Sequence, residues 1–226
     1  MVRPVTRVRA RAAAPALPPS VRVPLLVVAV AAAVVAVVLG IVFSGQTTGT
    51  VLDESVYQAI RGSIEPSFFY AVAWVVGSAG DPAGAALIVV VLGVVFLRSG
   101  QTRLAILVVA GPVVTGVVTT LAKPVASRFI NGDYLSYPSG HTAFVTSAGL
   151  MIGLFLTTRR GLGRVGGTAV ALGLALVCAA TMSWSQTANR VHYLTDTIGG
   201  FCVAVALVTA TAAVLDAVID GVKARR

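Results

Sequence analysis

The chain has 226 residues, of which 57% are hydrophobic and only 11% charged, and its mean hydropathy is +0.91. A soluble globular protein carries about 25% charged residues, so a chain this apolar cannot cover a water-facing surface and must be solvated by lipid. The net charge of +9 does not indicate nucleic-acid binding, because the basic residues lie in terminal segments and short loops rather than on a folded polar face.

The N-terminal region divides into a polar and an apolar part. Residues 1–22 are rich in Arg, Ala and Pro and have no apolar periodicity, which predicts a disordered basic arm on the cytoplasmic side. The apolar run Val23–Phe43 is long enough to cross a hydrocarbon core, which needs about 20 residues. It is longer than the apolar core of a signal peptide, so we expect a retained membrane anchor.

The next region, residues 44–82, has a mixed composition. Val51–Arg61 and Pro66–Val76 are predicted to form short amphipathic or interfacial helices. Asp53, Glu54 and Glu65 disfavour a complete crossing here, because ionised side chains are costly within a bilayer.

Five clearer apolar runs complete the chain: Ala83–Leu97, Leu104–Leu121, Thr142–Leu156, Gly167–Met182 and Leu194–Leu215. Together with the first run they predict an all-α membrane bundle of about six transmembrane helices. Residues 23–216 would form this single domain, and residues 217–226 a cytoplasmic tail.

The distribution of Lys and Arg predicts the orientation of the bundle. If the N-terminus lies inside, 13 of the 17 basic residues lie on the inner side. The other four lie on the outer side: Arg61, Lys123, Arg128 and Arg190. Cytoplasmic loops are enriched in Lys and Arg, so this orientation is favoured, with both termini in the cytoplasm. The loops 122–141 and 183–193 then lie outside, and they contain both histidines of the chain.

The first motif with chemical potential is Pro138-Ser139-Gly140-His141, at the start of an apolar run. Proline suits the first turn of a helix, and the free amides of that turn form an anion site. His141 in the same turn is placed to deliver a proton. A serine-capped helix with an incidental histidine would give the same tetrapeptide.

The second motif is the pair His192 and Asp196. A spacing of four places both on one face of a helix. A carboxylate there can accept the imidazole N–H, fix the tautomer and leave the other nitrogen as a nucleophile or base. A polar helix start at the membrane interface is the simpler alternative.

The third motif is the pair Lys123 and Arg128 in the first outer loop. Two cations this close could clamp a phosphate, although headgroup anchors would look the same.

The order of these three motifs resembles the type-2 phosphatidic acid phosphatase superfamily, whose members include membrane lipid phosphatases, bacterial acid phosphatases and vanadium haloperoxidases. The signature of that family runs KxxxxxxRP, then PSGH, then SRxxxxxHxxxD. Pro138–His141 match PSGH in full, His192 and Asp196 match HxxxD, and Lys123 matches the first lysine. The resemblance covers roughly residues 50–216.

The resemblance implies a role for each matching residue. His192 would be the nucleophile that takes the phosphoryl group, Asp196 would orient it, and His141 would protonate the leaving oxygen. Lys123, Ser139 and the Gly140 amide would bind phosphate oxygens. No metal or cofactor would be needed, and the partners would be a lipid phosphate and the bilayer, with no nucleic acid.

Two arginines of the family signature are absent at their positions. Ile130 stands at the arginine of the RP pair, and Gln186 at the arginine of the SR pair. We hypothesise that Arg128 and Arg190, which lie nearby in sequence, supply the missing phosphate-binding charge.

The resulting expectation is a metal-independent membrane hydrolase that acts at the outer face on a phosphomonoester or diphosphate. Polyprenyl diphosphate, phosphatidate and phosphatidylglycerophosphate are the substrate types considered. A phosphotransferase would use the same phosphohistidine, and an inactive lipid-phosphate binder would explain the missing arginines. A transporter is disfavoured, because transporter sites lie near the bilayer midplane.

Overall fold

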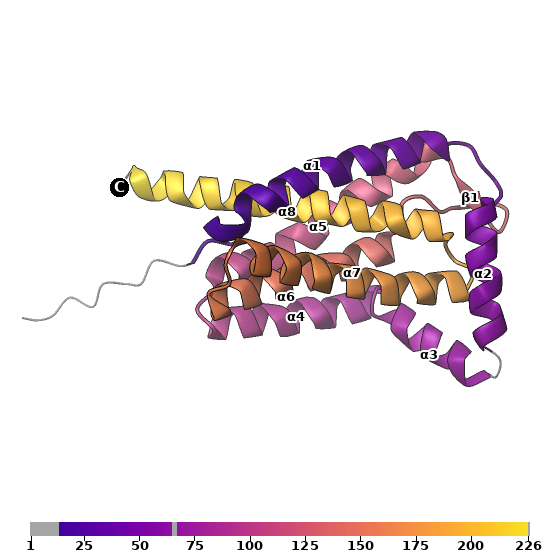
Figure 1. Ribbon diagram of the computed structural model, residues 1–226, viewed down its shortest axis with the longest axis horizontal. Coiled ribbons are helices and arrows are strands. Elements are labelled where there is room, and N and C mark those ends of the chain that lie inside the picture. The colour runs from indigo at the N-terminus through magenta and orange to yellow at the C-terminus, as the bar shows by residue number, and fades with distance from the viewer. Residues whose placement is uncertain (1–13, 65–66, 226) are drawn as a thin grey trace, which may run out of the picture.

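The computed structural model describes residues 14–64 and 67–225, which form a bundle of helices with one small hairpin (Figure 1). The helices are α1 (Pro19–Val42), α2 (Val51–Ile64), α3 (Ser67–Ser78), α4 (Pro82–Arg98), α5 (Thr102–Ala126), α6 (Gly140–Arg160), α7 (Arg164–Ala188) and α8 (Leu194–Ala224). The strands β1 (Phe129–Ile130) and β2 (Tyr134–Leu135) pair in antiparallel fashion after α5. The predicted all-α membrane bundle is confirmed.

Among the described residues, five helices are long and apolar enough to cross a membrane, namely α1, α5, α6, α7 and α8. Helices α3 and α4 pass the same test only together, and they are bent by 60° at the break between them. With this bent pair as one crossing, the chain has the six spans expected of it and is a multi-pass membrane protein. The sequence assigned the second span to Ala83–Leu97 alone, but α4 has 17 residues and α3 extends it.

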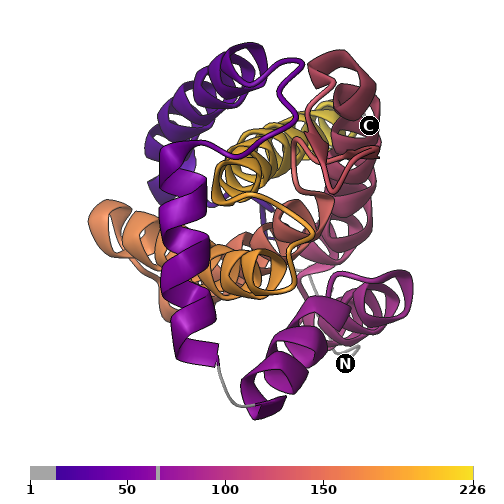
Figure 2. The same ribbon diagram turned by 90° about the vertical axis from the view of Figure 1, so that its right-hand side faces the viewer.

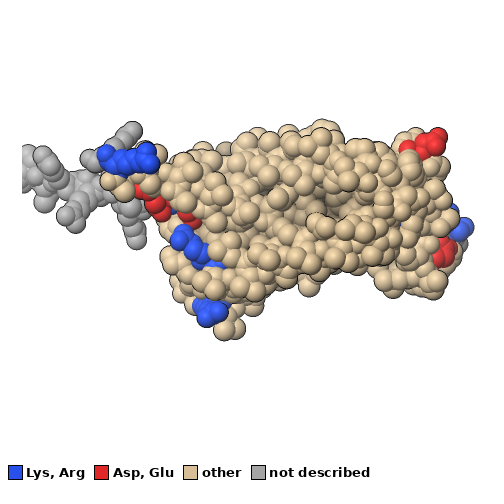
Figure 3. Space-filling model, turned by 90° about the horizontal axis from the view of Figure 1, so that it is seen from above, with Lys and Arg blue, Asp and Glu red and all other residues tan. Residues whose placement is uncertain are grey.

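Charged residues gather at the two ends of the bundle. On the face shown in Figure 3, a long middle band carries no Lys, Arg, Asp or Glu, and the charged side chains lie at either end. One end carries the C-terminus of α8, and the other, which we call the site end, carries α2 and β1 (Figure 1). This division is what a lipid-solvated bundle requires, because ionised side chains are costly within the hydrocarbon layer.

Small residues allow α6 and α7 to pack closely. A Cβ atom added to Gly153 would lie 2.4 Å from the Cα of Ala171, and one added to Gly149 would lie 2.7 Å from the carbonyl oxygen of Leu174. Both distances are too short for any larger residue. Close backbone approach of this kind strengthens helix association in a bilayer, where no hydrophobic effect drives helices together.

Helix α1 is an integral part of the bundle. Its residues Ala32 and Ala36 pack in one buried cluster with Cys202 and Val205 of α8. The hydroxyl of Tyr137 donates a hydrogen bond of 2.5 Å to the carbonyl oxygen of Ala36. These contacts join α1 to α8 and to the segment that precedes α6.

A buried carboxylate ties the two ends of the chain together at the end opposite the site. The side chain of Asp216 in α8 accepts hydrogen bonds from the backbone N–H groups of Ala16 (2.8 Å) and Leu17 (2.9 Å). It also pairs with Arg103 of α5 at 2.9 Å, and both charged side chains are almost completely buried. We call this group the Asp216 cluster.

The Asp216 cluster corrects the predicted boundaries. The arm was expected to remain disordered through residue 22, but α1 already begins at Pro19 and residues 16 and 17 are bonded to α8. The sequence did not reveal this, because the partner lies about 200 residues away. Residues 1–13 of the predicted arm lie outside the described residues. Most of the predicted tail, residues 217–224, continues α8 as helix.

Replacing Asp216 should destabilise the bundle strongly. In Asp216→Ala, Arg103 and two backbone N–H groups lose their acceptor while they remain buried. Breaking a buried ion pair on one side costs about 3–5 kcal/mol, and the melting temperature in detergent should fall by roughly 6–20 °C. Asp220→Ala is the matched control, since Asp220 also contacts Arg103 but its side chain is 58% exposed. Equal melting temperatures for the two variants would contradict this account.

Candidate active site

Three segments far apart in sequence meet at the site end. They are the α5–β1 region, the first turn of α6 and the connection between α7 and α8. Figure 2 looks at this end and shows α2 lying across it, with α3 beside it. The predicted convergence of the three motifs is therefore present in the fold.

His192 lies in the connection between α7 and α8 and is 7% exposed. Its Nδ1 atom is 3.8 Å from Oδ2 of Asp196, which is too long for a hydrogen bond, and Nδ1 has no other partner. Catalytic hydrogen bonds are often long in unliganded enzymes and tighten when substrate binds.

The surroundings of His192 lower the pKa of its imidazole below the usual value of 6.5. Burial is the largest cause, because it disfavours the charged ring. The carboxylate of Asp196 acts in the opposite direction, and the nearby Lys123 and His141 lower the pKa of His192 further. The imidazole is therefore held neutral near neutral pH, with a lone pair available.

His141 lies in the first turn of α6, as expected. Its Nε2 atom is 3.0 Å from Oδ1 of Asp81, the residue that precedes α4. Gly80 makes this approach possible, because a Cβ there would lie 2.4 Å from Cδ2 of His141. Asp81 was not predicted as a site residue, and its place just before Pro82 was the only available signal.

Both histidines line the same cavity, which we call the histidine pocket. Its volume is about 260 Å³, and it opens between α3 and the end of α7. Its lining residues come from α3, the α3–α4 break, α6, α7 and the α7–α8 connection: Trp74, Gly77, Ser78, Asp81, His141, Gln186, Asn189, Val191 and His192.

Gln186 occupies a notable place in this pocket. It stands where the family signature has an arginine, and it lines the cavity beside both histidines. Its Oε1 atom is buried without a partner, and its Nε2 atom has only the sulfur of Met182 at 3.5 Å. The side-chain amide is thus free to turn its N–H donors toward a bound anion. From the sequence alone, Gln186 is recognisable only as the loss of a charged residue at this position.

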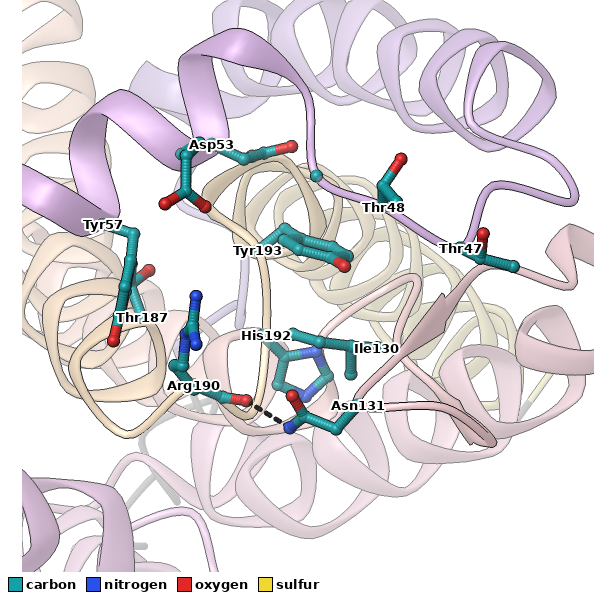
Figure 4. Close-up of a pocket in the computed structure, with 12 residues that line it drawn as sticks. Thr47, Thr48, Asp53, Tyr57, Ile130, Asn131, Thr187, Arg190, His192 and Tyr193 are labelled. Carbon is teal, nitrogen blue, oxygen red and sulfur yellow. Dashed lines mark hydrogen bonds between the residues drawn. The ribbon is translucent and has the colours of Figure 1, made fainter.

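A second cavity, the outer pocket, touches His192 from the side of α2 and has a volume of about 270 Å³ (Figure 4). Arg190 is exposed there and its guanidinium stacks over the ring of Tyr57 at 4.1 Å. Asn131 donates a hydrogen bond of 2.7 Å to the carbonyl oxygen of Arg190. Arg190 thus lines the outer pocket beside His192, and its role as a phosphate ligand stays a prediction. Ile130 contributes only an apolar side chain to this pocket.

Arg128 does not face either pocket, which corrects its predicted role as a phosphate ligand. Its side chain is fully buried, with one N–H group 2.6 Å from Asp196 and another 2.9 Å from Asp53 of α2. The guanidinium also lies over the rings of Phe43 and Tyr193, at 4.3 and 4.5 Å. With two carboxylates and two aromatic faces around it, Arg128 is a structural counter-ion.

Asp53 completes this buried charge network. It accepts hydrogen bonds from the backbone N–H and hydroxyl of Thr195, both at 2.9 Å, and from Thr50. Burial alone would raise the pKa of Asp53, but these hydrogen bonds outweigh it and lower the pKa below the usual 3.8. The carboxylate stays ionised, and it fastens α2 to the first turn of α8.

The remaining predicted ligands differ in accessibility. Lys123, near the end of α5, is partly buried and close enough for its charge to act on His192 and Asp196. Gly140 is partly exposed in the first turn of α6. Ser139 is fully buried, and its hydroxyl caps that helix by accepting from the N–H of Thr142 at 3.4 Å and from its hydroxyl. Its hydroxyl is thus engaged in the helix cap rather than presented to a pocket.

Within residues 14–64 and 67–225, no group of three or more His, Cys, Asp or Glu side chains is arranged to hold a metal ion. The two cysteines, Cys178 and Cys202, are free.

Comparison with known proteins gives three results. The family model of the PAP2 superfamily matches residues 117–220. A solved structure, that of a transmembrane PAP2-type phosphatidylglycerolphosphate phosphatase from Bacillus subtilis, matches with a TM-score of 0.64 and 19% identity over 84% of this chain and 96% of that one. No curated protein sequence matches the chain.

Over residues 117–220 this chain is similar to the PAP2 superfamily, as the three motifs predicted.

The matched PAP2 segment contains every site residue that the sequence motifs predicted. Asp53 and Asp81, which contact that segment from α2 and the α3–α4 break, lie before its first residue. The part of the chain before the matched segment therefore contributes two carboxylates to the site, and the family motifs do not include them.

Arg128 should prove structural rather than ligand-binding. In Arg128→Met, two buried carboxylates lose their cation, so the free energy of unfolding should fall by about 3–5 kcal/mol. Arg190→Met, at an exposed position, should leave the melting temperature nearly unchanged. Thermal unfolding in detergent measures both. An unchanged melting temperature in Arg128→Met, together with weaker binding of orthovanadate, would restore Arg128 as a phosphate ligand.

Proposed function

We propose that this protein is a lipid phosphatase of the PAP2 type in which His192 carries the phosphoryl group. The observation that supports this most strongly is that the only two histidines of the chain line one pocket, although 51 residues separate them. One is buried and held neutral, as a nucleophile requires, and the other is more exposed and paired with a carboxylate, as suits a proton donor.

The first chemical step forms a bond between a ring nitrogen of His192 and phosphorus. The P–O bond to the leaving group breaks, and this group is the lipid alcohol of a phosphomonoester or the lipid monophosphate of a diphosphate. The electron pair of that bond stays on the leaving oxygen, and His141 donates a proton to it. Asp196 faces Nδ1 and stabilises the imidazole as it becomes positive, so Nε2 is the attacking atom.

The second step reverses the proton transfer. Water attacks the phosphohistidine, His141 accepts a proton from the water, and the P–N bond breaks to release inorganic phosphate and neutral His192. An alcohol in place of water would give phosphoryl transfer to that alcohol, which is the phosphotransferase alternative. Neither step requires a metal ion.

Several groups are placed to stabilise the charge on phosphorus-bound oxygens. Lys123 supplies a cation near His192, the amide of Gly140 lies in the first turn of α6, and Gln186 offers an amide donor within the pocket. Arg190 can act from the adjoining outer pocket. This set has fewer cations than the family signature, which leaves a weak or inactive lipid-phosphate binder as the second candidate.

The candidate substrates are a polyprenyl diphosphate or monophosphate, a phosphatidate, and a phosphatidylglycerophosphate, the last being of the type named for the Bacillus subtilis protein. The basic residues Arg103, Arg159, Arg160 and Lys223 lie at the end opposite the histidines. The positive-inside rule then orients the site end away from the cytoplasm, with both termini inside.

His192→Ala should abolish phosphate release. The purified protein, assayed in detergent with EDTA and each of the three lipid types, should release phosphate, and the variant should lose more than about a thousandfold of this activity. As a control, the wild-type protein and the variant should have equal melting temperatures, which shows that both are folded. Release that EDTA abolishes would refute the metal-independent mechanism. Lipid binding without any release in the wild-type protein would favour the binder.

The acid limb of the pH profile should lie below pH 6.5. Protonated His192 cannot attack phosphorus, so kcat/KM should rise as pH rises through the pKa of His192 and be lost below it. Because burial and Lys123 lower this pKa, activity should persist at a pH where an ordinary histidine is protonated. Lys123→Met removes one cause of the lowering and should move the acid limb to higher pH. A limb above 6.5 in the wild-type protein would contradict the assignment.

A further inference from the structure

Helix α3 presents an unusual apolar surface at the site end. Its aromatic and aliphatic side chains are largely exposed: Phe68 (67%), Phe69 (42%), Tyr70 (41%), Trp74 (71%) and Val75 (69%). Figure 1 shows α3 leaning away from the line of α4. Aromatic residues of this kind favour the interface between hydrocarbon and headgroups.

Trp74 belongs to two environments at once. It is the most exposed large side chain of α3, and it also lines the histidine pocket beside Gly77 and Ser78. The lipid-facing surface of α3 is therefore continuous with the cavity that holds both catalytic histidines.

The chemistry of the proposed reaction decides on which side the lipid chain must lie. In an in-line displacement the leaving oxygen is opposite the attacking nitrogen of His192. That oxygen must lie near His141, its proton donor, and the hydrocarbon chain extends from it. His141 sits against the α3–α4 break through its contact with Asp81.

We propose that Trp74 and the exposed face of α3 form the binding surface for the hydrocarbon chain of the lipid phosphate. The chain lies over Trp74, at the mouth between α3 and the end of α7, and the phosphate lies beyond it between the two histidines. This inference rests on the proposed function, because the position of the leaving oxygen follows from His192 as nucleophile.

Two other apolar grooves flank the site and are the alternative binding sites for the hydrocarbon chain of the lipid. One, of about 420 Å³, lies between α7 and α8 and contains Trp184. It meets the outer pocket at Thr187, but neither histidine lines it.

The other groove, of about 370 Å³, lies between α1 and α5. Tyr137 separates it from the histidines, because its buried ring packs against Gly199 and its hydroxyl is bonded to α1. Of these three places, only the α3 surface is continuous with the histidine pocket.

The two tryptophans of the chain provide a direct test, since Trp74 marks the proposed surface and Trp184 marks the α7–α8 groove. In a His192→Ala background, Trp184→Phe leaves Trp74 as the only tryptophan, and Trp74→Phe leaves Trp184. A phosphatidate with brominated acyl chains should quench Trp74 saturably and leave Trp184 at the level of a control. The control is the brominated diacylglycerol at the same mole fraction, which measures quenching from the micelle alone. Saturable quenching of Trp184 and not of Trp74 would overturn the proposal.

Activity gives an independent readout in the protein with His192 intact. Trp74→Ala should lower kcat/KM for a long-chain phosphatidate by about tenfold, because lost apolar contact with the chain weakens its binding. The loss for a short, water-soluble phosphomonoester should be several-fold smaller, because that substrate has no hydrocarbon chain to contact Trp74. Trp184→Ala is the matched control and should affect both substrates equally. Equal loss for both substrates in Trp74→Ala would refute the chain-binding role.

The two proposals fail in different ways. Absence of phosphate release from either substrate by the wild-type protein would refute the phosphatase function. Release from both, with the long-chain preference unchanged in Trp74→Ala, would refute only the role of α3.

Discussion

One buried guanidinium holds the site end together. Arg128 neutralises a carboxylate from α2 and another from α8 while it is itself positioned by the loop after α5. The segments around residues 53, 128 and 196, which are far apart in sequence, are thus fixed relative to one another. A charge removed from water is costly unless it is paired with good geometry, so the three groups enforce a single arrangement. The position of Asp196 opposite His192 depends on this arrangement.

The same network determines which cations of the site remain free to contact a substrate. The carboxylate that faces His192 gives one oxygen to Arg128 and the other to the amide of Tyr193 at 2.9 Å. Because Arg128 is paired with these buried carboxylates, Lys123 and Arg190 are the cations that we propose bind the phosphate. A site with few free cations suits a substrate that is held partly by its hydrocarbon chain, which agrees with the exposed apolar face of α3.

The sequence predicted those parts of the molecule that depend on local pattern. Apolar runs predicted the membrane crossings, because a hydrocarbon layer accepts few other structures. The expectation that His192 and Asp196 share one helix face was wrong, because α8 begins only at Leu194 and His192 lies in the loop before it, although the two side chains still face each other. The parts it missed depend on long-range pairing. No feature of the sequence near Arg128 indicates that its guanidinium pairs with the carboxylate of Asp53, 75 residues earlier. Asp81 is likewise 60 residues from His141. Two cations in one loop suggested a phosphate clamp, and only the fold separates the buried one from the accessible one.

The Asp216 cluster has a consequence for how the bundle is assembled. The backbone N–H groups of residues 16 and 17 bind a carboxylate, that of Asp216, which is synthesised 200 and 199 residues after them. Arg103 pairs with the same carboxylate. Until α8 is inserted, these donors must be satisfied by water at the membrane surface. The first and last spans therefore close the bundle in a late step, and contacts between such distant residues form slowly. A nascent chain that stops before α8 would expose an arginine and two amides to the bilayer edge, which marks it as unfinished.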